Sequence, residues 1–362
     1  MLKKSLVWLR NDIRLDDNPA LQNAFIQSEF VHVLYLFSKK QLKRHNESDI
    51  KISFLIENLR DLSNSLDALN VGLSIIETDG FSDDPQEIIK FFKNNNFDKL
   101  FFNNTFGIDE NNRDAEIIKL LKEKNYDFEH FDDQILYRPG SILTNEGKPY
   151  SVFTPFKRKW LEFFNLDLLD IEYVYSAKNK KCLESNIENF NFPDTYNFDA
   201  ELWKVGEKGA KHALDNFLNS KASLYDKNRN DPILEGTSRI SPYLALGIVS
   251  SKRCILESIK LNNLDIYSGN KGILKWIDEI VWREFYRNII HAFPKVSMGK
   301  PFQAYTDKID WRYNESELKA WQTGNTGFPI IDAAMKQMLQ EGWMHNRLRM
   351  VVAMFFTKNM LH

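Results

Sequence analysis

The sequence predicts two domains, an α/β domain with a doubly wound parallel sheet and, after it, an all-helical domain. At 362 residues and 42.6 kDa the chain is too long for one ordinary hydrophobic core. Its first part alternates short apolar runs with segments of helical periodicity, whereas its last part shows helical spacing throughout. Between them, residues 167–201 are rich in Asn, Asp, Lys and Tyr and show no period, which is typical of an interdomain connection.

Five apolar runs predict the strands of the α/β domain: Ser5–Leu9, Val31–Phe37, Leu73–Ile76, Leu100–Asn103 and Phe128–Phe131. Apolar residues recur at helical spacing from Ile52 to Leu69, and Asp84-Pro85-Gln86-Glu87 predicts an N-cap, a first-turn proline and a capping-box partner. No GxGxxG follows the first run, so the sequence gives no support for a conventional dinucleotide fingerprint.

Five segments predict the helices of the second domain, because apolar residues recur in them three and four positions apart. They are Ala210–Phe217, Pro242–Lys260, Leu274–Ile290, Pro329–Leu339 and Met344–Leu361.

Composition narrows the cellular compartment in which we expect the protein and the kinds of molecule that it can bind. The two cysteines, Cys182 and Cys254, are far apart and lack CxxC or His-rich neighbours, so we expect neither a disulfide framework nor a metal site. No apolar run reaches the length of a signal-peptide core or a membrane span. We therefore expect a soluble, cytoplasmic monomer. The net charge is −2, but residues 201–362 hold 23 Lys and Arg against 17 Asp and Glu, a small basic excess compatible with phosphate contacts.

One broad face of the helix at 274–290 combines aromatic and charged side chains. At about 100° per residue this face holds Trp276, Glu279, Trp282, Arg283, Tyr286 and Arg287. Such a face suits the wall of a polar, aromatic pocket, where stacking and charge-assisted hydrogen bonds act together. The alternative is a surface helix with an ordinary i,i+4 salt bridge between Glu279 and Arg283.

A turn rich in glycine and hydroxyl groups, Glu235–Pro242, leads into the helix predicted at 242–260. Its backbone N–H groups, its hydroxyls and Arg239 form a candidate phosphate cradle without a Walker sequence. The alternative is that Ser241-Pro242 is only a helix cap with proline at the first position.

A third segment, Gly342–Met350, places Asn346, Arg349 and Met350 on one helical face. The alternatives are that Met350 only fills core space and that His345 is structural. Neither residue has a neighbour at the spacing of a hydrolytic dyad.

These three segments, together with Val7–Asn18 and Tyr150–Phe156, resemble the photolyase and cryptochrome family in order and spacing over residues 1–362. The resemblance implies a Rossmann-like α/β domain over residues 1–132, an interdomain linker over 133–200 and an all-α FAD-binding domain over 201–362 that is incomplete at its C-terminal end. It implies a deoxyribodipyrimidine photolyase of class I type, a carbon–carbon lyase. Such an enzyme repairs cyclobutane pyrimidine dimers in DNA by light-driven electron transfer from reduced FAD.

The family's site residues transfer to matching positions of this chain. FAD contacts implied by the resemblance are Tyr225, Thr237, Ser238, Arg239, Ile240, Ser241, Trp276, Arg283, Asn346 and Arg349. Contacts to ultraviolet-damaged DNA are Arg229, Glu279, Trp282, Asn346, Arg347 and Met350. A base flipped from the duplex needs stacking surfaces and hydrogen-bond partners for its edges. Asparagine at 346, where six-four photolyases have a second histidine, favours the cyclobutane-dimer class.

Two departures from the family bear on activity. Asp109-Glu110 stands where members with a folate antenna, methenyltetrahydrofolate, have Asn-Glu, so antenna binding and a solvated acidic turn remain alternatives. Relatives also continue beyond the match to Lys358–Leu361 with the aspartate that pairs with the Arg349 equivalent and two electron-transfer tryptophans. Only the outermost tryptophan has a match, Trp311, which is alternatively a packed core residue. We therefore expect weak or absent FAD binding by this chain. The alternative functions are a cryptochrome-type signalling flavoprotein and an inactive remnant.

Overall fold

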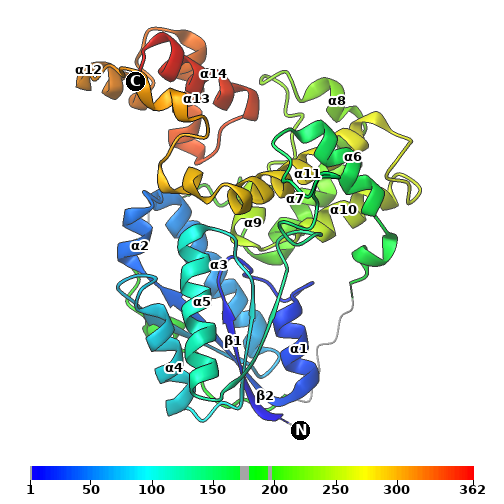
Figure 1. Ribbon diagram of the computed structural model, residues 1–362, viewed down its shortest axis with the longest axis vertical. Coiled ribbons are helices and arrows are strands. Elements are labelled where there is room, and N and C mark those ends of the chain that lie inside the picture. The colour runs from blue at the N-terminus through cyan, green and yellow to red at the C-terminus, as the bar shows by residue number, and fades with distance from the viewer. Residues whose placement is uncertain (1, 172–178, 195–197) are drawn as a thin grey trace.

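The computed structural model describes residues 2–171, 179–194 and 198–362. Its first part is a parallel five-stranded sheet with strand order β3-β2-β1-β4-β5 (Figure 1). The strands are β1 (Leu2–Leu9), β2 (Ser28–Phe37), β3 (Gly72–Glu77), β4 (Lys99–Asn103) and β5 (Asp127–Phe131). All five predicted strands are confirmed, each extended by a few residues at most, and β1 lies where the strand order reverses.

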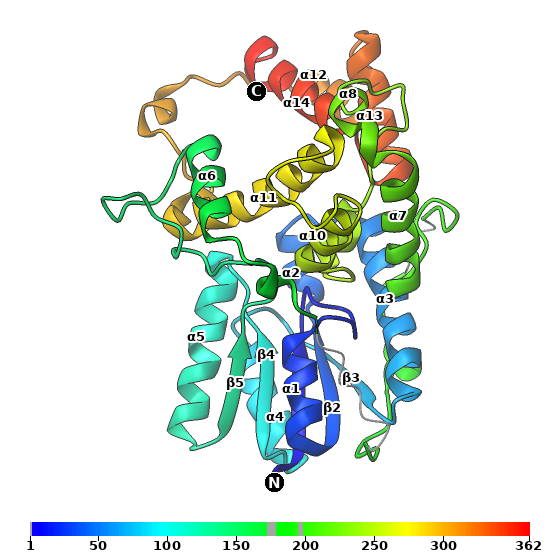
Figure 2. The same ribbon diagram turned by 90° about the vertical axis from the view of Figure 1, so that its right-hand side faces the viewer.

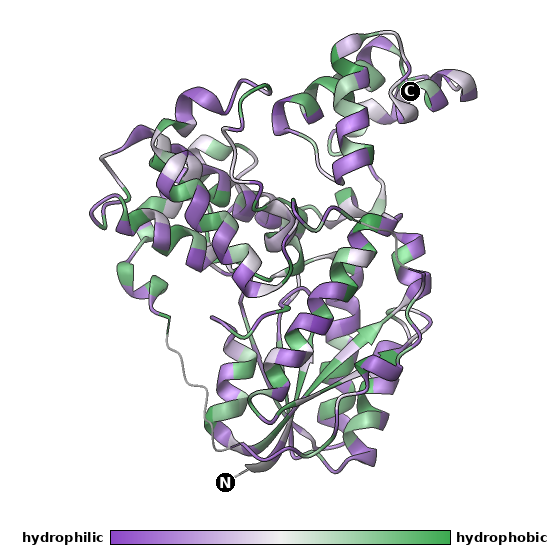
Figure 3. Ribbon diagram, turned by 180° about the vertical axis from the view of Figure 1, so that it is seen from behind, coloured by the Kyte–Doolittle hydropathy of each residue, from purple (hydrophilic) through white to green (hydrophobic). Residues whose placement is uncertain are grey.

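Helices cover both faces of the sheet. Successive residues of a strand point to opposite faces, so apolar residues on each face need a covering layer of helices. Val7 and Leu9 belong to the core beneath α1 (Pro19–Gln27) and α3 (Asp49–Asp67), whereas Leu6 and Trp8 belong to the core beneath α4 (Asp84–Asn94) and α5 (Ile108–Glu123). The central residues of the inner strands are therefore mostly apolar, as the green strand segments in Figure 3 show. The doubly wound α/β prediction is confirmed.

The helical part lies beyond the carboxyl ends of the strands in both views (Figures 1 and 2). Its longest helix, α11 (Lys271–Ala292), runs across this part, and α6 and α10 pack against it. The remaining helices are α2 (Lys39–Arg44) in the α/β part and, further along, α6 (Phe153–Phe163), α7 (Gly206–Ser220), α8 (Tyr225–Asn228), α9 (Ser241–Leu246), α10 (Ser251–Lys260), α12 (Glu315–Thr323), α13 (Pro329–Glu341) and α14 (Asn346–Met354).

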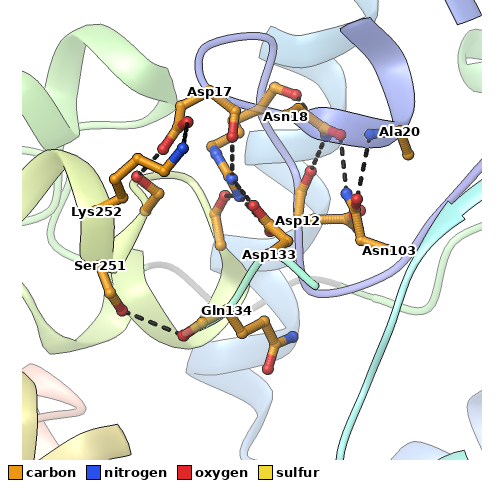
Figure 4. A network of polar contacts seen from close by, with 12 residues as sticks. Asp12, Asp17, Asn18, Ala20, Asn103, Asp133, Gln134, Ser251 and Lys252 are labelled. Atoms are coloured by element: carbon orange, nitrogen blue, oxygen red, sulfur yellow. Dashed lines mark hydrogen bonds and ion pairs between the residues drawn. The ribbon is translucent and has the colours of Figure 1, made fainter. Parts of the chain in front are cut away.

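A close backbone contact joins the two parts. Gly247 ends α9 with φ of 69°, and a Cβ at this position would lie 2.0 Å from the carbonyl oxygen of Asn11. Arg14, which is buried, donates to the carbonyl of Gly247 at 3.0 Å and pairs with Asp133. Figure 4 shows the surrounding network, in which Asp17 receives contacts from the helical part. Only glycine fits here without strain.

The structure differs from three predictions of the helical part. The helix predicted over Pro242–Lys260 is two helices, because left-handed Gly247 stops α9 and Ser250 caps α10. The predicted helix Met344–Leu361 is regular only over α14, and a π-helical turn, Phe355–Asn359, follows. Helix α6 lies inside the range predicted as linker, and its Phe153, Phe156 and Trp160 are buried. Residues 172–178 and 195–197 of that range lie outside the described residues.

None of the described helices has the length and apolarity that a membrane crossing requires. Within residues 2–171, 179–194 and 198–362, no cluster of three or more His, Cys, Asp or Glu side chains is arranged to hold a metal ion.

Candidate functional site

The main candidate for a functional site is a cavity of about 640 Å³ between the helical part and the amino-terminal end of α3. Its volume lies within the range of about 300–1,000 Å³ that is typical of small-molecule and cofactor sites. Its walls come from the 237–241 turn, from α11, from the segment between α13 and α14, and from the first turns of α3. All ten residues predicted to bind FAD line it: Tyr225, Thr237, Ser238, Arg239, Ile240, Ser241, Trp276, Arg283, Asn346 and Arg349.

The 237–241 turn forms the first wall. Arg239 has a left-handed backbone, with φ of 50°, which reverses the chain direction before α9. Next to it, a Cβ at Gly236 would lie 2.7 Å from Cβ of Asn228, so the turn lies tightly against α8. Ile240, not Ser241, is the N-cap of α9, and it makes no side-chain cap hydrogen bond. The interpretation of Ser241 as a mere helix cap is therefore wrong.

Helix α11 forms the second wall with Trp276, Glu279, Ile280 and Arg283. Trp276 is buried, and its ring centroid lies 5.1 Å from that of Phe217 on α7. The indole is thus fixed by packing and contributes a rigid aromatic ring to the cavity wall. Ile280, which is not part of the predicted aromatic and charged face, also reaches this wall.

Two charged residues of α11 have partners that the sequence did not indicate. Glu279 pairs with Arg229, not with Arg283, so the i,i+4 salt-bridge alternative is wrong. Arg283 donates to the carbonyl of Gln134 at 2.5 Å and to the hydroxyl of Ser251 at 2.9 Å. Burial lowers the pKa of the Arg283 guanidinium, and these neutral acceptors hold it. Arg283 therefore connects α11, at the cavity wall, to the chain at Gln134, which follows β5.

Trp282 lies outside the cavity lining. Its ring stacks on Phe153 of α6, with centroids 3.7 Å apart and planes inclined by 10°, and it also stacks on Tyr286. The broad face predicted on α11 is thus divided between two environments. Trp276, Glu279 and Arg283 line the cavity, whereas Trp282 and Tyr286 belong to an aromatic cluster with α6.

The segment from Glu341 to Arg349 forms the third wall. His345 is buried and caps α14 by accepting from the backbone N–H of Arg347 at Nδ1, which confirms a structural role. Its Nε2 has no hydrogen-bond partner within the described part of the chain, and burial lowers the pKa of the ring, as do the nearby Arg347 and Arg229. Arg349 lines the cavity and has no ion-pair partner among the described residues.

Three further predicted residues lie outside the cavity lining. Arg347 donates from Nε and Nη2 to the side-chain oxygen of Asn230, at 2.9 and 2.7 Å. Met350 follows it on α14 and is 49% exposed. Trp311 is 51% exposed, so the alternative of a packed core residue is wrong.

Asp109 and Glu110, the residues predicted to touch an antenna, lie in the first turn of α5. Asp109 faces His45, with 3.8 Å between Oδ2 and Nε2. The Glu110 carboxylate lies against Gly107, because a Cβ on this glycine would meet its Oε2 at 1.9 Å. Both carboxylates therefore have neighbours within the α/β part.

The sequence analysis missed the contribution of the α/β part to the cavity. Ser48, the N-cap of α3, lines it together with Ile50, Lys51 and Phe54 of that helix, and so does Trp203. These residues carry no local signal, because only the docking of the two parts brings them to the site. Trp343, which also lines the cavity, lies within the predicted Gly342–Met350 segment and was identifiable.

Comparisons with known proteins identify the family of the chain. Residues 5–174 match the family model of DNA photolyase, and residues 276–362 match the FAD binding domain of DNA photolyase. The deoxyribodipyrimidine photo-lyase of Escherichia coli is 35% identical over 358 residues, which are 98% of this chain and 75% of that protein. The chain belongs to the DNA photolyase family.

Solved photolyase-family structures share the fold. The bacterial class III photolyase from Agrobacterium tumefaciens superposes with a TM-score of 0.86 at 28% identity, over 100% of this chain and 74% of that one. The cryptochrome of Synechocystis superposes with a TM-score of 0.80 at 20% identity, over 100% and 76% of the two chains, and shows the fold alone. The predicted pairing of an α/β domain with a helical FAD domain is confirmed.

The cavity fits the cofactor in the name of the matched family domain. FAD combines a planar ring system with two phosphates. The cavity offers three indoles, four guanidinium groups and a turn with three hydroxyls. It also holds an orphaned imidazole nitrogen, that of His345. Guanidinium groups and hydroxyls suit phosphates, and aromatic rings suit a planar heterocycle.

Proposed function

We propose that this protein is a deoxyribodipyrimidine photolyase that repairs cyclobutane pyrimidine dimers in DNA, with FAD bound in the 640 Å³ cavity. The observation that carries the proposal is the convergence on one cavity of the 237–241 turn and the Trp276–Arg283 wall, two elements separated in sequence. When bound and reduced, FAD would supply the light-driven electron transfer by which the dimer is split. The protein's own residues bind and orient the FAD and the dimer and shield them from water.

The hydroxyls of Thr237, Ser238 and Ser241 are the proposed donors to the phosphates and the sugar-like chain of FAD. Tyr225, Ile240 and Trp276 are the proposed packing surfaces, since all three are buried. Asn346 and Arg349 approach from α14 and complete the wall. Arg239 and Arg283 already have protein partners, so we propose that they shape the cavity more than they contact the cofactor.

For DNA, Glu279 and Asn346 are the proposed acceptors and donors to the edges of the damaged bases, because both line the cavity. Trp282 and Met350 do not line the cavity, so they would contact only those parts of the lesion that remain outside it. Arg229 and Arg347 are proposed near the DNA backbone. Trp311 is a proposed electron carrier, and its 51% exposure suits the outer end of such a chain.

Three finer points are proposals. A folate antenna, methenyltetrahydrofolate, is proposed beside Asp109 and Glu110. The protein is proposed to act as a monomer, which light scattering after gel filtration tests. A cytoplasmic location is proposed as well, and its support is that Cys182 and Cys254 are free thiols in the structure, as a reducing compartment requires.

The deciding experiment measures repair directly. Protein incubated with FAD and a reductant is mixed with an oligonucleotide that carries one thymine dimer, and dimer loss is followed by chromatography under blue light and in darkness. We expect loss only under illumination. Tight flavin binding without any light-dependent dimer loss would instead favour a signalling flavoprotein, and absence of flavin binding would refute the proposed site.

A further inference from the structure

Arg239 is a residue with a Cβ in a backbone conformation that such residues rarely adopt. A left-handed residue other than glycine persists only where its surroundings hold it, and such positions gather at functional sites. The 237–241 turn therefore needs a restraint from outside its own five residues. The side chain of Arg239 shows where that restraint lies.

The Arg239 guanidinium is held by two residues from the end of α13. Its Nη1 donates to Oε2 of Glu341 at 3.0 Å, and its Cζ lies 4.6 Å from the centroid of the Trp343 ring. The two charged side chains are 25% and 30% exposed, so water screens the pair only in part. Stacking and ion pairing act on the same planar group, a combination that arginine offers and lysine lacks.

Glu341 is itself fixed in place. Its carbonyl oxygen accepts from Nε1 of Trp203 at 2.7 Å, and its carboxylate lies 3.4 Å from Nε2 of Gln337. The next residue, Gly342, has φ of 67° and lies against the side chain of Ile50 on α3. The anchor for Arg239 is thus tied to the segment at 203 and to the α/β part, so the turn is held by the assembled molecule.

We propose that Glu341 and Trp343 are positioning residues that hold the 237–241 turn through Arg239, so that its hydroxyls and N–H groups face the cofactor phosphates. This inference rests on the proposed FAD site. It gives Arg239 a different role from that implied by the family resemblance, because its charge is engaged by Glu341. A guanidinium engaged in this way organises the turn and does not serve as the principal countercharge of the phosphates.

Glu341→Gln gives opposite results under the two roles. If Glu341 only lies near the phosphates, removing its negative charge strengthens FAD binding or leaves it unchanged. If it holds the turn, the same change loosens the turn and weakens binding. We expect FAD affinity, measured in darkness by quenching of flavin fluorescence, to fall about fivefold, the effect of losing a partly exposed charge-assisted pair. Glu315→Gln on α12 makes the same charge change away from the cavity and is the control.

A second readout needs no cofactor. Hydrogen exchange of the amides at 237–241 reports local opening of the turn. We expect faster exchange there in Glu341→Gln and Trp343→Leu, and near-normal exchange in Trp343→Phe, which keeps an aromatic ring. In Arg239→Met, adding Glu341→Gln should change neither exchange nor affinity further, because both substitutions break one interaction.

The outcomes separate the inference from the proposed function. Unchanged exchange at the turn in Glu341→Gln, or tighter FAD binding, would overturn the positioning role while leaving the FAD site intact. Faster exchange in a protein that binds no FAD would support the positioning role and refute the proposed function.

Discussion

Arg229 on the α8 side of the cavity pairs with Glu279 of α11, and its guanidinium also lies over the ring of Tyr225, 5.4 Å from the centroid. The Arg229 side chain is 10% exposed and that of Glu279 is 26% exposed. One residue proposed near the DNA backbone therefore directly holds another that is proposed to meet the damaged bases. With these proposed roles, the pair would couple contact with the DNA strand to recognition of the lesion.

Arg229→Met should lower affinity for dimer-containing DNA about tenfold or more, since it leaves the Glu279 carboxylate without its partner in a half-buried site. Fluorescence anisotropy with a labelled oligonucleotide in darkness measures the change. Lys122→Met, at the far end of α5, removes the same charge elsewhere and should have little effect. Equal weakening by both variants would mean that net charge alone is responsible.

Arg347→Gln should weaken binding to damaged and undamaged DNA to a similar degree. Its guanidinium lies outside the cavity, on Asn230, where a backbone phosphate can be reached without entering the lesion site. Loss of one phosphate contact reduces the slope of log K against log salt by about one. Binding measured at several salt concentrations tests this, and an unaltered slope would exclude the phosphate role.

Glu284 should make stability depend on pH. It is buried and accepts from the N–H groups of Leu136 and Tyr137, and burial raises its pKa to about 7. Because the folded pKa exceeds the unfolded one, its contribution is complete below about pH 4.5 and is lost as pH rises through 7, by about 3 kcal/mol. Urea unfolding at pH 5 and pH 8 should show a smaller difference in Glu284→Gln than in the parent protein. An identical difference would exclude this assignment.

Gly247→Ala should destabilise the protein by about 2–4 kcal/mol, because it combines a left-handed backbone with a Cβ that overlaps the Asn11 carbonyl. Gly299→Ala is the matched control. Its φ is 70°, nearly the same, but nothing lies within 4 Å of the added carbon, so about 1 kcal/mol is expected. Thermal unfolding compares the two, and similar losses would show that the contact with Asn11 relaxes easily.

The strands and most helices could be predicted from local pattern, because side-chain alternation and helical spacing are local properties. Helix α9 ends at Gly247 for a reason that is not local, since the glycine is needed by Asn11, more than two hundred residues earlier. Helix α6 was not predicted, although its buried Phe153, Phe156 and Trp160 lie three and four positions apart. The end of α9 could not be predicted, because a contact between distant segments decides it.

The candidate site shows the same division. The cavity-lining residues of the 237–241 turn and of α11 could be predicted, because they lie in segments with an unusual composition. Helical periodicity could not predict that Trp276 lines the cavity and Trp282 does not, since both lie on one broad side of α11. Trp282 differs because it stacks on Phe153 of α6. The partner of Glu279 was also beyond prediction, because Arg229 follows α8, fifty residues before Glu279.

The residues that wall the cavity extend from Ser48 to Arg349 in the sequence, with strands β3, β4 and β5 and most of the helical part between them. During translation the strands can pair early, but the cavity cannot close until α14 has emerged and the most distant contacts have formed. A nascent chain would thus expose its aromatic walls for most of its synthesis. Flavin that binds when the cavity closes would shift the equilibrium between the open and the assembled protein toward the assembled one. The supply of riboflavin should therefore influence how much of the newly made chain survives proteolysis.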